Sequence, residues 1–224
     1  MKTRWLALVA LIWAASSLPL QGQVGPVVQM DFSNPGLTPA HWTLILHPDG
    51  SGHFRSERGN LAESLRTSEV PRMEAPDQDR DIHLSGQFAE RVFQTARGHK
   101  LFGEECESHA KVAFQGQRKL SYASSEGQGS CEFNYSRDKE IQALSDSLIA
   151  VATTILEGAR LEMLLQHDRL GLDSEMEYMT EALADRRVQQ ICAIRGILER
   201  LAEDQDVMER VRKRARLLLA NAEE

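Results

Sequence analysis

The fold is decided by one stretch of the chain, His41-Trp42-Thr43-Leu44-Ile45-Leu46-His47, followed by Pro48-Asp49-Gly50-Ser51-Gly52 and His53-Phe54-Arg55-Ser56-Glu57. Trp42, Leu44 and Leu46 alternate with other residues, so they share one face, as the residues of a half-buried strand do. The glycines between the two runs supply the positive φ angles of a tight turn. This stretch predicts a β-hairpin with one apolar face, and hence an antiparallel sheet.

Further strand signals lie on both sides of the hairpin. Val27 to Phe32 is an apolar run that ends at a turn signal, and Arg80 to Leu84 has the composition of a short strand. Three later strands are expected around Val112 and Phe114, around Leu120 and Tyr122, and from Cys131 to Tyr135. Residues 58–80 are polar and contain two prolines, which predicts an exposed loop.

Helical patterns begin with Ser85, which is expected to cap a helix that ends at Gly98. After Arg137 there is no proline, and apolar residues recur at helical spacing in residues 138–167 and beyond. We therefore predict an α+β fold, in which an antiparallel sheet with one packed helix is followed by a C-terminal helical hairpin or three-helix unit. The expected domains are an α+β sheet domain at 24–137 and a helical domain at 138–224. The wide apolar face of the helix at 138–167 favours packing on both.

The first residues have the layout of a secretory signal peptide. Lys2 and Arg4 precede an apolar run from Trp5 to Ala15, and small residues and Pro19 follow it. The run is shorter than the roughly 20 residues of a membrane-spanning helix. We expect residues 1–22 to be a cleaved leader, with the cut open between Ala14 to Ser17 and Gly22 to Gly25. The expected location is the periplasm or the outside of the cell, without stable membrane insertion once the leader is removed.

Charge and cysteines limit the function classes. The net charge of −7 argues against nucleic-acid binding, which requires a basic surface. Export makes a disulfide chemically reasonable, and we predict one between Cys106 and Cys131, the alternative being two free thiols. Cys192 has apolar neighbours and is expected mid-helix as a small buried side chain, which argues against a nucleophilic role.

Two histidines flank the predicted turn, His47 and His53, and Asp49 lies between them. If the hairpin register placed them opposite each other, the two imidazoles and the carboxylate would be weak candidates for a metal site. Histidines beside a turn on a solvated face are ordinary, so no metal or other cofactor is predicted.

Known catalytic motifs are absent from the sequence, which contains no nucleophile elbow, no HExxH and no CxxC. No catalytic residue is assigned. One enzymatic alternative stays open, a hydrolase whose site combines histidines and carboxylates. It would require a pocket with at least two of the following histidines beside an acid: His41, His47, His53, His83, His99, His109 and His167.

Opposite charges gather in the helical half. Acidic residues crowd the bend near residues 157–181, and a basic cluster lies at 210–216. Solvated helix surfaces are the ordinary explanation, and an electrostatic match between the two segments is the alternative.

Several stretches together resemble a family of uncharacterised secreted proteins of bacteria. They are Trp42–Leu44, Asp49–Phe54, Lys111–Gly116, Gly129–Tyr135 and Arg160–Leu172. The resemblance covers most of the chain after the leader and implies a bacterial exported protein. It implies no activity, so no functional residue is carried over.

The sequence is most consistent with a non-enzymatic domain that binds another, unknown protein. The aromatic residues Trp42, Phe54, Tyr122 and Tyr135 are the candidate contacts, because interfaces are enriched in aromatic side chains. Core packing is the alternative for most of them. A homodimer formed by the C-terminal helices is a further expectation.

Overall fold

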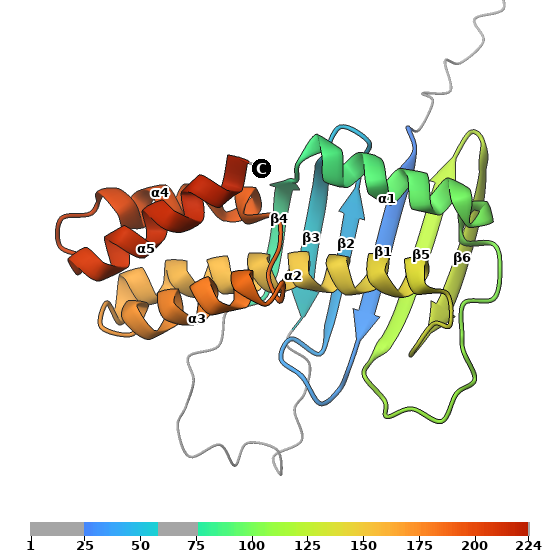
Figure 1. The fold of residues 1–224 in the computed structure, drawn as a ribbon, viewed down its shortest axis with the longest axis horizontal. Helices are drawn as coiled ribbons and strands as arrows, with labels where there is room; N and C mark the ends of the chain where they lie inside the picture. Colours follow the sequence, from blue (N-terminus) through green and yellow to red (C-terminus); the bar gives the residue numbers. More distant parts are fainter. Residues whose placement is uncertain (1–24, 58–75, 224) are drawn as a thin grey trace, which may run out of the picture.

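The computed structural model describes residues 25–57 and 76–223. The predicted leader, and residues 58–75 of the predicted loop, lie outside them. Six strands form one antiparallel sheet in the order β4-β3-β2-β1-β5-β6 (Figure 1). The strands are β1 Val27–Ser33, β2 His41–Leu46, β3 Ser51–Glu57, β4 Gln78–His83, β5 Gln117–Ser124 and β6 Gly127–Phe133.

The predicted hairpin is confirmed as β2 and β3, in which Leu44 faces Phe54. Gly50 occupies the turn with a φ of 85°, and a Cβ atom there would lie 2.3 Å from the carbonyl oxygen of Leu84. This position therefore requires glycine both for its backbone angle and for the close approach of β4's end. Since β4 begins at Gln78, the last residues of the predicted loop belong to a strand.

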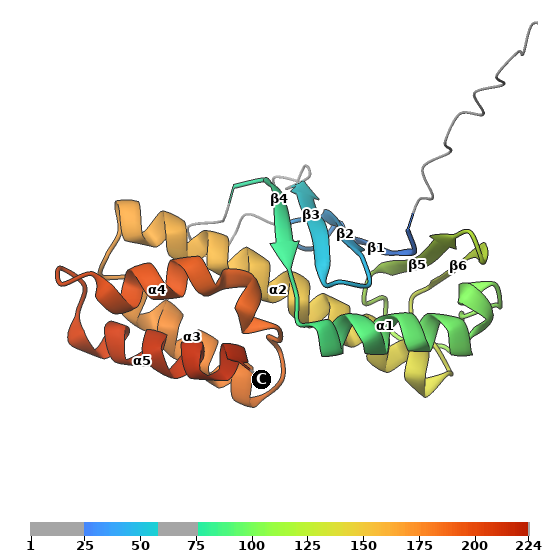
Figure 2. The ribbon, with the colours of Figure 1, turned by 90° about the horizontal axis from the view of Figure 1, so that it is seen from above.

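Two helices cover one face of the sheet, α1 Gly86–Gly98 and α2 Lys139–His167 (Figures 1 and 2). The hydroxyl of Ser85 accepts a hydrogen bond from the Phe88 amide, and the Asp138 carboxylate accepts from Ile141, so both predicted helix starts are confirmed. Apolar residues of alternate strand positions fill the layer between sheet and helices. From the strands they include Met30, Leu44, Phe54, Leu120 and Phe133, and the helices contribute Phe93 and Leu148.

Beyond the sheet, three more helices form the C-terminal unit, and the far end of α2 completes it (Figure 2). They are α3 Leu172–Ala184, α4 Arg195–Glu203 and α5 Glu209–Ala220. Short 3₁₀ turns are η2 Lys100–Phe102, η3 Ile191–Ile194 and η4 Asn221–Glu223. The α+β fold with a C-terminal helical unit is thus confirmed.

Helix α2 belongs to two cores. Leu148 and Ile155 lie in the sheet core, and Leu161 and Leu164 lie in the helical core. Gly158 lies between these groups, and a Cβ atom there would be 2.3 Å from Cγ2 of Ile194 in η3. A glycine in mid-helix lowers helix propensity, but here it lets η3 approach the helix backbone.

The strand expected at Val112 and Phe114 is wrong. Residues 109–116 have no regular secondary structure, and both side chains are exposed. β5 has its two neighbours in β1 and β6, so the segment has no place beside it in the sheet.

Within the described ranges, no helix has the length and apolar character needed to cross a membrane.

Candidate functional site

Exposed apolar side chains gather at one end of the sheet. The described residues contain six exposed large hydrophobic side chains, and four of them lie on the loop between β1 and β2, on the segment before β5, and just after β6 (Figure 1). We call these four residues the end patch: Leu37, Val112, Phe114 and Tyr135. Phe114 is the most exposed of them, at 58%. Exposed apolar side chains that gather in one region are typical of protein-binding sites.

Two asparagines hold the segment that carries Phe114. The side chain of Asn134 accepts a hydrogen bond from the Gln115 amide at 2.7 Å and donates to the Ala113 carbonyl at 3.2 Å. The side chain of Asn34, at the other side, donates to the Gln115 carbonyl at 3.3 Å. The backbone on both sides of Phe114 is therefore fixed between the ends of β1 and β6.

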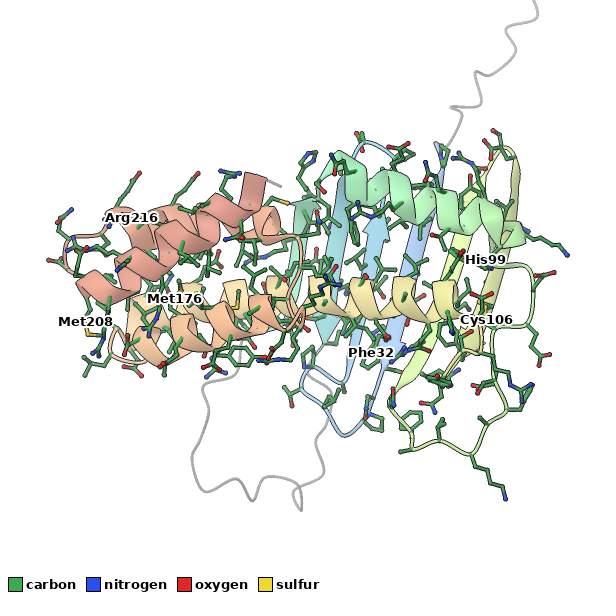
Figure 3. All side chains as sticks on the ribbon, in the orientation of Figure 1. Phe32, His99, Cys106, Met176, Met208 and Arg216 are labelled. Carbon is green, nitrogen blue, oxygen red and sulfur yellow. A yellow bond between two sulfur atoms is a disulfide. The ribbon has the colours of Figure 1, made fainter. Side chains whose placement is uncertain are left out.

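A disulfide anchors the start of the same segment. Cys106 is bonded to Cys131 of β6, as predicted, with the Cα atoms 5.7 Å apart (Figure 3). Next to it, the Glu107 carboxylate accepts hydrogen bonds from the amides of Asn134 and Ser108, both at 2.8 Å. These bonds, that from Asn134 first, lower the pKa of Glu107. A backbone held in this way would lose little conformational entropy if another molecule bound to the segment.

The four aromatic residues predicted as contacts separate into two groups. Trp42, Phe54 and Tyr122 are buried in the sheet core, where Trp42 stacks on Phe32 with ring centroids 5.2 Å apart. Their alternation on the strands directs them under the helices, so they are not available as surface contacts. Tyr135 follows the last strand and stays exposed.

The metal candidates do not come together. In the hairpin His53 faces Ile45, whereas the His47 amide donates to the Ser51 carbonyl. The expected pairing of His47 with His53 is wrong. That pairing would require a turn centred on Gly50, whereas the observed turn is centred on Asp49. The Asp49 carboxylate accepts from the side chain and amide of Ser51, which lowers the pKa of Asp49. The described residues contain no group of three or more side chains placed to hold a metal ion.

His53 instead lies between two carboxylates of β4 on the face of the sheet opposite the helices. Its Nδ1 is 2.9 Å from Asp81 and its Nε2 is 3.0 Å from Asp79. The hydrogen bond to Asp81, with the charge of Asp79, raises the pKa of His53 above its ordinary 6.5. Since both ring nitrogens contact carboxylates, the arrangement favours a fixed imidazolium rather than a general base.

A second histidine has a similar setting at the start of α2. His99, labelled in Figure 3, has Nε2 2.9 Å from Glu140 and Nδ1 3.6 Å from Asp138. A pocket of about 50 Å³ lies beside it, lined also by Glu104, Glu105 and Cys106. It holds one histidine and is far smaller than the roughly 300 Å³ at which ligand pockets begin. Hollows of about 250 and 600 Å³ elsewhere have no histidine in their lining.

Cys192 is half-buried, and its place differs from the mid-helix position expected. It lies in η3, just before α4, with its sulfur 3.8 Å from the carbonyl oxygen of His83. Burial raises the pKa of the Cys192 thiol. A thiol of raised pKa carries little thiolate and is a poor nucleophile at neutral pH.

The charged segments of the helical half match each other within the chain. Asp173 of α3 contacts Arg214 at 2.6 Å and Arg210 at 2.8 Å, both from α5. Arg160 of α2 lies 2.6 Å from Glu175, whose side chain is 5% exposed. The bend between the helices is thus more than a solvated acidic surface, because one of its carboxylates is buried.

The C-terminal helices direct most of their apolar side chains into the helical core. Leu198 and Leu201 of α4, and Val211 and Leu218 of α5, are buried there, and Leu217 is exposed. Dimerisation through these helices therefore stays a prediction. Leu217 is the exposed large hydrophobic side chain on α5 that supports it.

No protein-family model matches the chain, and a search of curated proteins finds no match either.

Proposed function

We propose that this is an exported bacterial protein that works by binding another protein through the end patch, without catalysis of its own. One observation carries the proposal, namely that four of the six exposed large hydrophobic side chains of the described residues share one end of the sheet. Scattered exposed hydrophobics are ordinary, but a gathered group with two aromatic rings has the composition of an interface centre.

The rigidity of the patch supports the same proposal. The asparagine contacts and the Cys106–Cys131 disulfide hold the segment without burying Phe114. A segment fixed in place while its aromatic side chain is exposed is well suited to present that side chain to a partner.

The disulfide also supports export, because such bonds persist in oxidising compartments such as the periplasm. Mass spectrometry of the protein from cell fractions tests this part. We expect material in the envelope or medium that begins after the leader and carries the bridge. Cytosolic material with an intact Met1 and three titratable thiols would contradict it.

Site-specific photocrosslinking tests the binding surface. A photoreactive phenylalanine analogue is placed at Phe114, and the matched control carries it at Leu217, an exposed apolar position on α5. We expect one discrete crosslinked partner from Phe114 after export, and none of the same mass from Leu217. Equal crosslinking from both positions, or none from Phe114, would refute binding through the end patch.

Substitution of the same surface gives the energetic test once the partner is identified. Phe114→Ala and Tyr135→Ala should each weaken binding by about 1–2 kcal/mol, the range of moderate interface hot spots. Leu170→Ala, at an exposed side chain in the turn between α2 and α3, is the control and should leave binding unchanged.

A further inference from the structure

We propose that β6 pairs edge to edge with β6 of a second copy of this chain, antiparallel and centred on Ser130, so that two sheets join into one. This inference goes beyond the proposed function and uses a different surface, the outer edge of the sheet. It names a second copy as the occupant because the edge is complementary to itself.

The outer edge of β6 is unpaired over a defined length. β6 is the last strand of the sheet, and within the described residues it pairs only with β5. Beyond Phe133 the chain is already covered, since Glu107 bridges to Ser136 and the Ser108 amide donates to the Tyr135 carbonyl. The unpaired stretch therefore ends where the segment carrying Glu107 begins.

The backbone groups of alternate residues point away from the sheet. A two-residue turn joins β5 and β6, so its closing pair, Ser124 and Gly127, exchanges hydrogen bonds across the hairpin. Alternation then directs the amides of Gln128, Ser130 and Glu132 outward. The Asn134 amide agrees with this direction, because it donates to Glu107 on the outer side.

The two edges of the sheet differ in how they are protected. Natural edge strands carry charges or proline, or are covered, which prevents pairing with other chains. β4 carries the exposed carboxylates of Asp79 and Asp81, and η3 packs beside its end, where Cys192 contacts His83. β6 has no proline, no lysine and no arginine, and Glu132 is its one charged residue. η2 also packs on the helix-side face of β6, where a Cβ atom at Gly129 would lie 2.3 Å from the Leu101 carbonyl oxygen. The difference between the two edge strands is therefore in their charge, since β4 carries Asp79, Arg80 and Asp81 and β6 carries Glu132 alone.

A register centred on Ser130 is complementary on the face opposite the helices. Ser130 then faces Ser130 of the second copy, and Gln128 faces Glu132 twice, related by the two-fold axis. Each carboxylate meets an amide instead of another carboxylate, and within its own sheet Glu132 keeps Lys119 at 3.2 Å. In this register Asn134 faces the turn between β5 and β6 of the second copy. The second copy's β6 therefore ends where the segment that carries Glu107 begins to cover the edge.

The first test measures the oligomeric state of the purified, disulfide-bonded protein by sedimentation velocity across a dilution series. We expect a reversible dimer. Gln128→Glu places two carboxylates opposite each other at both symmetric positions and should raise the dimer Kd by about 2- to 30-fold. Gln128→Glu combined with Glu132→Gln restores an amide opposite each carboxylate and should return the Kd to near its original value.

The second test blocks the outward amide. Ser130→Pro removes a donor that β5 does not use, so the fold should persist and the dimer should be lost, whereas Ser130→Ala should dimerise normally. Thermal unfolding of each variant checks folding, and the charge variants decide the matter if the proline variant does not fold. A monomer at every concentration overturns the proposal. A dimer whose Kd is unchanged by the substitutions at residues 128, 130 and 132 also overturns the proposal.

Discussion

The sheet half and the helical half are stabilised by different means. The sheet half has a core rich in aromatic side chains and a covalent link between Cys106 and Cys131. The helical half contains no cysteine bridge among its described residues and instead buries a charged pair, Arg160 and Glu175. A covalent bond is insensitive to salt and to neighbouring substitutions, whereas a buried ion pair depends on both partners being present. The two halves should therefore fail under different perturbations.

The largest expected effect is in the helical half. Glu175→Ala leaves the Arg160 guanidinium buried without its carboxylate and should lower the free energy of unfolding by about 3–5 kcal/mol. Denaturant unfolding followed by circular dichroism measures it. The double variant Arg160→Met with Glu175→Leu should be far closer to the parent protein. If Glu175→Ala lowered the free energy of unfolding no more than the loss of an exposed ion pair does, the expected contribution of the buried pair would be contradicted.

The next effect is in the sheet half. Replacing Cys106 and Cys131 by alanine opens a loop with a sequence separation of 25 residues and should cost about 3 kcal/mol in the chain-entropy model. Unfolding of the variant, compared with the parent in the presence and absence of reductant, gives the value. Reductant should destabilise the parent and leave the variant unchanged, so equal sensitivity of the two would contradict the assignment.

A smaller effect is expected where the halves meet. Gly158→Ala gains helix propensity but places a methyl group 2.3 Å from Ile194, so a net loss of about 1–2 kcal/mol is expected. The matched control is Gly196→Ala in α4, where a Cβ atom meets nothing within 4 Å. Gly196→Ala should stabilise by up to about 1 kcal/mol, and opposite signs in thermal unfolding would confirm the close contact at Gly158. Stabilisation by both would show that η3 is free to move away.

The smallest effect concerns pH and belongs to the sheet half alone. Because Asp81 and Asp79 raise the pKa of His53 in the folded state, the imidazolium stabilises the fold below the ordinary value of 6.5. This contribution is lost as pH rises through the folded pKa. Asp81→Asn should therefore lower stability at pH 5 more than at pH 8, and NMR titration should show a lower His53 pKa in the variant. An equal loss at both pH values would contradict the linkage.

The sequence was informative wherever a local pattern coincided with a tertiary contact. The alternation of Trp42, Leu44 and Leu46 predicted β2 and its buried face, and Ser85 and Asp138 predicted two helix starts. The long apolar seam of residues 138–167 correctly favoured packing on both cores. The prediction of the disulfide followed from the expected export, and the Cys106–Cys131 bond confirms the pairing.

Features that depend on partners distant in the chain were not predictable. Phe114 alternates with Val112 as in a strand, but hydrogen bonds from Asn34 and Asn134 fix it in an irregular segment. The His53 side chain has its partners on β4, and one of them, Asp79, lies in the range that the sequence predicted to be a loop. Tyr122 and Tyr135 both continue an apolar alternation in the sequence. Tyr122 lies within β5 and is buried, whereas β6 ends at Phe133, so the ring of Tyr135 is exposed.

The place of α2 in the chain also has a consequence for synthesis. All six strands precede it, yet one of the two helices that cover them is encoded after residue 138. An emerging polypeptide that has completed its strands still exposes part of their apolar face until the next 29 residues arrive. Nascent chains halted before Lys139 should thus be recognised by holding chaperones at the uncovered sheet, while the complete chain, in which α3 to α5 also cover the far end of α2, should not need them.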